Sequence, residues 1–173
     1  TIRDRQQHPL EIPVLEGGHG HHYFCPVHNT QFVFDWNSPD GHYCTECRKK
    51  WSGVDKYDWA WVNFVHAANL EYLKANMYLY LATDKRRFAR NIASMLLDLS
   101  RKYPVYKIHD RERRYTPGTS GKMFSQSLDE AVWAIDVARA YLVAAKAMTV
   151  DERRQIEEGF LRPCAELLMA SRD

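Results

Sequence analysis

The sequence lacks several features that would assign it to an obvious class. No run of about eighteen apolar residues is present, so no membrane-spanning helix is expected. Lys and Arg number 24 against 22 Asp and Glu, and the resulting net charge of +2 is too small to argue for a nucleic-acid partner. Neither an initiator Met nor a signal-peptide pattern opens the chain at Thr1. This suggests a piece excised or processed from a longer protein, and it leaves the compartment open.

Cysteine is also scarce, but three of the four cysteines fall in one short stretch with paired spacing. Cys25 and His28 are three positions apart, as are Cys44 and Cys47, and residues 29–43 are long enough to form a hairpin between the pairs. Zn²⁺ takes four sulfur or nitrogen ligands in a tetrahedron, and two residues three apart on a tight turn can face one ion. The pattern therefore predicts a zinc site. Because all four ligands come from the protein, we expect the zinc to be structural.

Other assignments of these residues remain open. The cysteines could form two disulfides or stay as free thiols, although Cys44 and Cys47 are too close for an easy bridge and Cys164 lies in a helical pattern. The fourth metal ligand is also open, because other histidines lie nearby in the sequence: His19, His21, His22 and His42.

The N-terminal third of the chain shows turns and short extended runs. Residues 1–22 carry two Pro and three Gly without a helical period, which predicts an extended lead-in. Residues 23–53 are expected to form the zinc-ribbon-like hairpin, in which Phe32-Val33-Phe34 precedes a strong turn signal at residues 37–41.

Residues 54–173 have helical periodicity, so the fold class is mainly α. We expect helices at 57–82 and 85–102, packed antiparallel, followed by a loop at 103–126. A third helix is expected at 127–147, with Ser127 and Glu130 at capping-box spacing. A fourth helix is expected after the similar start signal Thr149–Glu152, with a kink or restart at Pro163.

Several motifs in succession resemble the N-terminal half of heparinase II/III-like polysaccharide lyases and the related oligoalginate lyases. They are CPVH, FDWNSPDGHYC-x-x-C, WSG, YDWAWVNFVHAANL, YLATDKRRFARNIASMLLDLSRKYP, SLDEAVWAIDVARAYLV and LRPCAELL, and they extend from about Gly20 to Leu168. The resemblance implies a partial (α/α) toroid of antiparallel helical hairpins, which in such lyases is followed by a β-sandwich domain. This sequence contains only about two hairpins and no β-rich tail, so the rest of the toroid and the sandwich are expected partners.

The resemblance also implies a function. Such lyases cleave uronic-acid-containing poly- or oligosaccharides by β-elimination, which requires stabilisation of an enolate charge and a base for the proton next to the carboxylate. The Asn-His pair typical of the family is not found in this sequence, so we expect the catalytic groups outside this chain. The chain would then contribute one wall of the cleft, in a bacterial protein that is periplasmic or secreted.

Candidate residues for that wall lie around the start of the third helix. Gln126, Glu130 and Trp133 share one helix face if the helix register extends back to Gln126, and amide, carboxylate and aromatic groups suit contacts with sugars. Alternatively, Glu130 closes a cap and Trp133 belongs to the core. Further candidates in the preceding loop are Tyr115, Lys122 and His109. Arg111, Arg113 and Arg114 could attract a polyanion or form a solvated charge run.

Two functions of other classes remain open. A zinc-ribbon and helical module could bind nucleic acid or protein through the basic stretch Arg48–Trp51, although the low net charge disfavours nucleic acid. A glycoside hydrolase on an α/α toroid would need two facing carboxylates. Asp129 and Glu130 are adjacent on a helix and point about 100° apart, so they make a poor acid and base pair.

Overall fold

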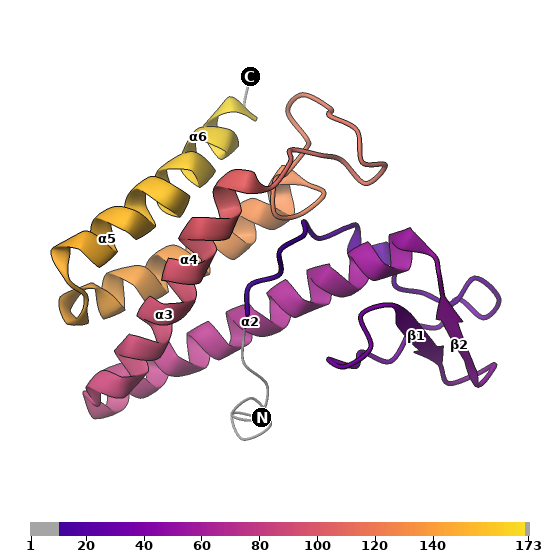
Figure 1. Cartoon of the computed structure of the whole chain (residues 1–173), viewed down its shortest axis with the longest axis horizontal. Helices are drawn as coiled ribbons and strands as arrows, with labels where there is room; N and C mark the ends of the chain where they lie inside the picture. Colours follow the sequence, from indigo (N-terminus) through magenta and orange to yellow (C-terminus); the bar gives the residue numbers. More distant parts are fainter. Residues whose placement is uncertain (1–10, 172–173) are drawn as a thin grey trace.

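A computed structural model describes residues 11–171, and within these residues the protein is mainly helical with one small two-stranded sheet. Figure 1 shows a bundle of helices with the sheet beside the N-terminal end of the longest helix. The elements are the turn η1 (Gly20–His22), strands β1 (Gly41–Cys44) and β2 (Lys49–Ser52), helices α2 (Asp55–Thr83) and α3 (Arg86–Lys102), the turn η2 (Tyr103–Val105), helix α4 (Ser127–Ala144), the turn η3 (Ala145–Ala147), helix α5 (Val150–Ile156), the π-helical η4 (Glu157–Leu161) and helix α6 (Arg162–Ala170).

Helices α2 and α3 form the first antiparallel pair, close to the expected bounds. α2 contacts both α3 and α4, which explains why its sequence is apolar on more than one side. Asp84 ends α2 in a left-handed conformation with φ 52°, a geometry that Asp tolerates better than most side chains. The N-cap of α3 is Lys85.

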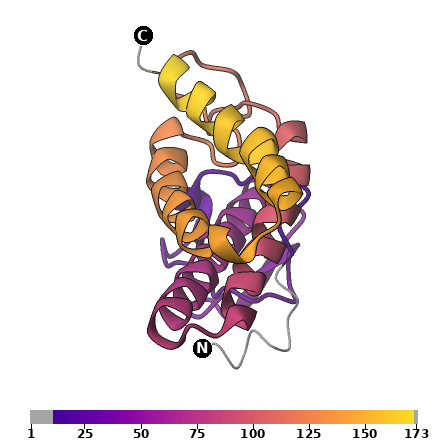
Figure 2. The same cartoon turned by 90° about the vertical axis from the view of Figure 1, so that its left-hand side faces the viewer.

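The second antiparallel pair consists of α4 and the continuous rod α5–η4–α6, which packs on α3 and α4 (Figure 2). α5 begins with the predicted capping box. Thr149 Oγ1 accepts a hydrogen bond from Glu152 N, and the Glu152 carboxylate accepts one from Thr149 N. Arg90 of α3 binds both carboxylate oxygens of Glu152, at 2.9 and 2.7 Å. A π-helical turn precedes Pro163, which lacks the N–H needed to continue regular helical bonding.

The hairpin differs in place from the expectation. The strands β1 and β2 pair from Gly41↔Ser52 to Cys44↔Lys49. The tight turn of the hairpin therefore lies at residues 45–48, and it contains Cys47 of the second ligand pair. Across the expected turn at residues 37–41 only the bridge Val33↔Tyr43 forms. In that loop Ser38 Oγ donates to Gly41 O at 2.6 Å, which holds a wider curve than a hairpin turn.

Residues 11–19 of the lead-in contain no helix or strand and are part of the folded body, and residues 1–10 lie outside the described range. Ile12 is 1% exposed within the main core, and its N–H donates to Asp98 Oδ2 of α3 at 3.0 Å. Gly18 N donates to Trp59 O of α2 at 2.6 Å. A Cβ at Gly18 would lie 2.6 Å from the Trp59 Cβ, so this close approach requires glycine.

Two hydrophobic cores stabilise the fold. The larger lies between the four helical segments, and the smaller lies under the hairpin around Tyr23, Phe32 and Tyr57. Helix α4 also presents an exposed apolar stripe at helical spacing, formed by Leu128, Val132, Ile135 and Leu142. Within residues 11–171, no helix combines the length and the apolar character needed to cross a membrane.

Candidate metal centre and adjoining groove

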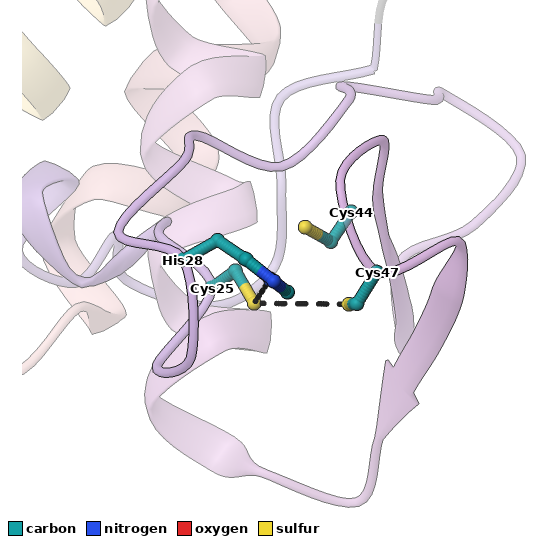
Figure 3. Close-up of side chains that lie close together, drawn as sticks. All are labelled: Cys25, His28, Cys44 and Cys47. Carbon is teal, nitrogen blue, oxygen red and sulfur yellow. Dashed lines mark hydrogen bonds between the residues drawn. The ribbon is translucent and has the colours of Figure 1, made fainter.

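The structure brings Cys25, His28, Cys44 and Cys47 together, with their ligand atoms all within 4.8 Å of one another. Figure 3 shows the two pairs on separate loops that face each other. Cys25 Sγ lies 3.8 Å from His28 Nδ1 and 3.9 Å from Cys47 Sγ. This arrangement could hold one metal ion between the two loops.

The two loops have the same backbone design. Cys25 N donates to Thr30 O and Asn29 N donates to Cys25 O, both at 2.8 Å, which closes the first loop. The fourth residue after the first ligand is left-handed in each loop, with φ 51° at Asn29 and 54° at Arg48. These turns orient both ligands of each pair toward the same point.

The electrostatics favour thiolate, the form that binds metal, at two of the three cysteines, Cys25 and Cys47, whereas at Cys44 the Cys47 N–H is outweighed by burial and the neighbouring thiols, which raise the pKa. Burial opposes ionisation of Cys25, but backbone N–H groups of His28 and Val27 outweigh it and lower the pKa of the thiol to about 6. Burial likewise opposes ionisation of Cys47, yet the Lys49 N–H and neighbouring side chains lower its pKa. Cys25 and Cys44 are buried while His28 is exposed, so the cluster is covered from the core side and reaches the surface at the histidine.

The structure contains no disulfide among the four cysteines, and it places the other histidines away from the metal cluster. All four cysteines lie in the described range and all have free thiols, with Cys164 buried in α6. His42 is fully buried, where Nε2 contacts Asp58 Oδ1 at 2.7 Å and Nδ1 contacts the Tyr23 hydroxyl at 3.2 Å. The remaining nearby histidines cluster on η1, with the His19 and His21 ring centroids 5.0 Å apart. They do not join the metal cluster.

A groove of about 960 Å³ lies between η1, α2, the first turn of α4 and the edge of the metal-binding hairpin. We call it the aromatic groove, because five aromatic side chains line it: Phe24, Phe34, Phe64, Phe124 and Trp133. Polar groups alternate with them, among them His19, His21, Gln31, Asn63 and Gln126. Two of the predicted wall residues, Gln126 and Trp133, therefore line the same groove.

Trp133 serves the core as well. It is 5% exposed, packs edge-on against Phe160 with ring centroids 5.9 Å apart, and donates from Nε1 to His66 O at 3.3 Å. Only a small part of the indole therefore reaches the groove.

Glu130 does not reach the groove. It is fully buried and accepts hydrogen bonds from the Tyr103 hydroxyl, from Lys122 N at 2.5 Å and from Met123 N at 3.0 Å. The expected capping box with Ser127 is wrong, because Gln126 is the N-cap residue and no side chain caps α4. Glu130 instead fixes the backbone of the segment that leads to Phe124 and Gln126.

The other candidates are dispersed. Tyr115 and Lys122 line a separate hollow of about 270 Å³ near α6. His109 is buried in the loop, with Nδ1 2.9 Å from Asp110 O. Arg113 folds inward, its guanidinium carbon 4.2 Å from the centre of the Trp59 ring, so it is separated from the exposed Arg111 and Arg114.

Several groove residues were not singled out from the sequence. Asn63 and Phe64 lie within a long helical pattern that shows no local sign of a binding role. His19 and His21 belong to a histidine-rich stretch that is recognisable in the sequence. Their proximity to Gln126 in the groove, however, depends on the tertiary packing of the lead-in near the start of α4.

Comparison with known proteins relates the chain to polysaccharide lyases. No known protein-family model matches the chain. An "Alginate lyase" from Stenotrophomonas maltophilia is 30% identical over 105 residues, which are 61% of this chain and 14% of that protein. An "Exo-oligoalginate lyase" from Saccharophagus degradans is 27% identical over 103 residues, which are 60% of this chain and 14% of that protein. The match thus spans about one seventh of the length of these relatives.

Proposed function

We propose that this chain is part of a polysaccharide lyase that cleaves a uronic-acid-containing polysaccharide of the alginate type by β-elimination, and that it contributes one wall of the substrate cleft. The similarity to two alginate lyases over about 60% of the chain carries the proposal. The rest of a toroid and a β-sandwich domain would complete the enzyme, which would be periplasmic or secreted. The heparinase II/III-like relationship belongs to the same proposal.

The aromatic groove supports a role in binding sugars. Sugar rings combine apolar faces with many hydroxyl groups, and the groove combines Phe24, Phe34 and Phe64 with the amides of Asn63 and Gln126. In this proposal Gln126 contacts sugar hydroxyls and Trp133 supplies part of an apolar face. Glu130 does not contact substrate; it affects binding indirectly, by holding the backbone that leads to Phe124 and Gln126. Tyr115 and Lys122 would contact a more distant part of the chain of sugars.

The exposed stripe on α4 supports the partial toroid. Beyond the part of α4 that lines the groove, the two antiparallel helix pairs leave Ile135 and Leu142 in solvent, as expected when further helical hairpins normally cover one face. The catalytic groups would come from that missing portion, across the groove from this wall.

We assign the metal cluster to structural zinc. Two sulfurs at about 2.3 Å from one zinc in a tetrahedron are about 3.8 Å apart, and Cys25 Sγ and Cys47 Sγ are 3.9 Å apart. Three cysteines and one histidine would fill all four positions and leave none for a reacting water. The zinc would tie the two loops of the hairpin together and contribute to folding.

Turnover assays on the full-length protein test the lyase proposal. Alginate oligosaccharides should yield a rise in ultraviolet absorbance from the unsaturated uronate product, and Gln126→Ala should raise KM by roughly tenfold through loss of a hydrogen bond to substrate. Tyr78→Ala, an exposed position on α2 outside the groove, serves as the control. New reducing ends without unsaturated product would indicate a hydrolase, and salt-sensitive binding of DNA or RNA without turnover would indicate a nucleic-acid module.

A further inference from the structure

A second hollow, of about 440 Å³, adjoins the aromatic groove and shares Gln126 and Leu128 with it. Its wall combines two arginines of the 103–126 loop with hydroxyl groups and the start of α4: Arg111, Arg114, Thr119, Ser125 and Ser127. We call it the cationic hollow. Its position beside the groove means that a chain of sugars lying in the groove could extend into it.

The N-terminus of α4 opens toward this hollow without a side-chain cap. Ser127 N donates to Thr119 O at 2.9 Å and Glu130 N donates to Gln126 O at 3.2 Å. Among the described residues, the N–H groups of Leu128 and Asp129 have no such partner. An 18-residue helix therefore presents unpaired donors and the positive end of its dipole near the hollow.

A buried hydroxyl gives an independent sign of a ligand. Ser125 lines the hollow and is 1% exposed, yet its Oγ has no hydrogen-bond partner in the described structure. A buried polar group without a partner costs free energy, so such groups normally meet a ligand or an ordered water. The hydroxyl and the open helix terminus both offer donors to an acceptor.

The charges around the hollow favour an anion. The carboxylate of Asp110 is already engaged by its own loop, where Oδ1 accepts from Glu112 N at 2.8 Å and Oδ2 accepts from Thr116 Oγ1 at 2.8 Å. Arg111 and Arg114 make only loose ion pairs, at 3.5 Å to Glu112 and 3.8 Å to Asp110. Both arginine side chains are exposed and can turn toward a bound group.

We propose that the cationic hollow is a subsite for the carboxylate of a uronate unit, next to the unit that lies in the aromatic groove. This inference rests on the proposed function and adds how the acidic sugar is recognised. Arg111 and Arg114 supply charge, and the Ser125 hydroxyl and the first N–H groups of α4 supply directed hydrogen bonds.

Initial-rate kinetics of the full-length protein with an oligomannuronate probe test the subsite. Arg111→Gln and Arg114→Gln should each raise KM by roughly threefold to tenfold at low ionic strength, with kcat within about twofold and a smaller effect at high salt. Ser125→Ala should raise KM by roughly tenfold without lowering the melting temperature, because the hydroxyl has no partner to lose inside the protein. Arg139→Gln is the matched control. Arg139 is also an exposed arginine, with 66% of its side chain accessible, but it lies further along α4 and outside the hollow.

The outcomes separate this inference from the lyase proposal. Turnover by the wild-type protein with unchanged KM in Arg111→Gln, Arg114→Gln and Ser125→Ala would overturn the subsite and leave the lyase proposal standing. An equal rise of KM in Arg139→Gln would also overturn it, since the rise would then reflect loss of positive charge anywhere on the surface and not loss of a contact in the hollow. Absence of unsaturated product with any uronate polymer would overturn both.

Discussion

Replacement of Glu130 tests how the groove is built, because this buried carboxylate joins α4 to two distant segments. In Glu130→Ala, three donors lose their acceptor: the Tyr103 hydroxyl, Lys122 N and Met123 N. Each buried donor left without a partner costs about 1–3 kcal/mol, part of which water entering the cavity would recover. We expect Glu130→Ala to lower the free energy of unfolding by about 4 kcal/mol.

Glu130→Gln separates hydrogen bonding from charge at the same position. The amide keeps the shape of the side chain, its oxygen can accept from the two backbone N–H groups, and its NH₂ can donate to the Tyr103 hydroxyl oxygen. We expect a loss within about 1.5 kcal/mol. Denaturant unfolding of the three proteins, monitored by circular dichroism, provides the comparison.

The pH dependence gives a further check on Glu130. Burial raises the pKa of this carboxyl, against the opposing effect of its hydrogen bonds to Tyr103 and the backbone. A raised pKa in the folded state means that the contribution of the group to stability is complete below the unfolded pKa and declines as the pH rises through the folded pKa. The disadvantage of Glu130→Gln relative to the wild type should therefore shrink as the pH rises.

Two results would refute this reasoning about Glu130. A loss below about 1 kcal/mol in Glu130→Ala would show that the three donors are satisfied without the carboxylate. Equal destabilisation by Glu130→Gln and Glu130→Ala would show that the negative charge, and not the hydrogen-bond geometry, holds the loop.

Three further predictions concern the metal cluster, acid stability and helix packing. Cys44→Ser should reduce zinc from about one per chain to a trace and lower the melting temperature, while Cys164→Ser should keep the metal, as measured by atomic emission and thermal scans. Hydrogen bonds from its arginine partner and from its helix cap lower the pKa of Glu152 to about 2. Stability from Glu152 should therefore be lost as the pH falls from about 4.5 to about 2, and acid titration of Glu152→Gln should lack this loss. Gly159→Ala should destabilise by about 1–3 kcal/mol in denaturant despite the better helix propensity of alanine, because the added Cβ would meet Ser100 Cβ at 2.9 Å and come still closer to its carbonyl oxygen. Unchanged stability there would mean that α3 and η4 can separate freely.

The helices and the metal cluster were predictable because their signals are local in the sequence. Periodicity placed α2 and α3 within a few residues, and the paired spacing identified Cys25, His28, Cys44 and Cys47 as one cluster. The choice of His28 over His42 depended on tertiary structure, since His42 is engaged by Asp58 and the Tyr23 hydroxyl.

The groove and the role of Glu130 were not predictable from local signals. Ser127 and Glu130 have capping-box spacing, but Glu130 finds stronger partners in Tyr103 and the backbone of residues 122–123, which the chain fold brings to it. A buried acceptor for several donors is worth more than one exposed cap, so the tertiary contacts override the local pattern. The lead-in was expected to be extended, but nothing in its sequence predicted that η1 would form one side of a groove opposite Gln126.

The metal cluster and the groove are connected through the backbone, which gives a structural metal a consequence for binding. Phe24 precedes Cys25 and pairs with Gln31 in a bridge that closes the first metal-binding loop, and both residues line the aromatic groove. Loss of the metal would loosen this loop, because the tip of the loop would then be held only by the backbone hydrogen bonds of Cys25 with Asn29 and Thr30 and, at its base, by the bond from Phe32 N to Tyr23 O. The phenylalanine and glutamine would then lose their fixed positions before the helical core is affected. Cys44→Ser should therefore raise KM for an oligosaccharide at temperatures where the helices are still folded, although no ligand of the metal touches the groove.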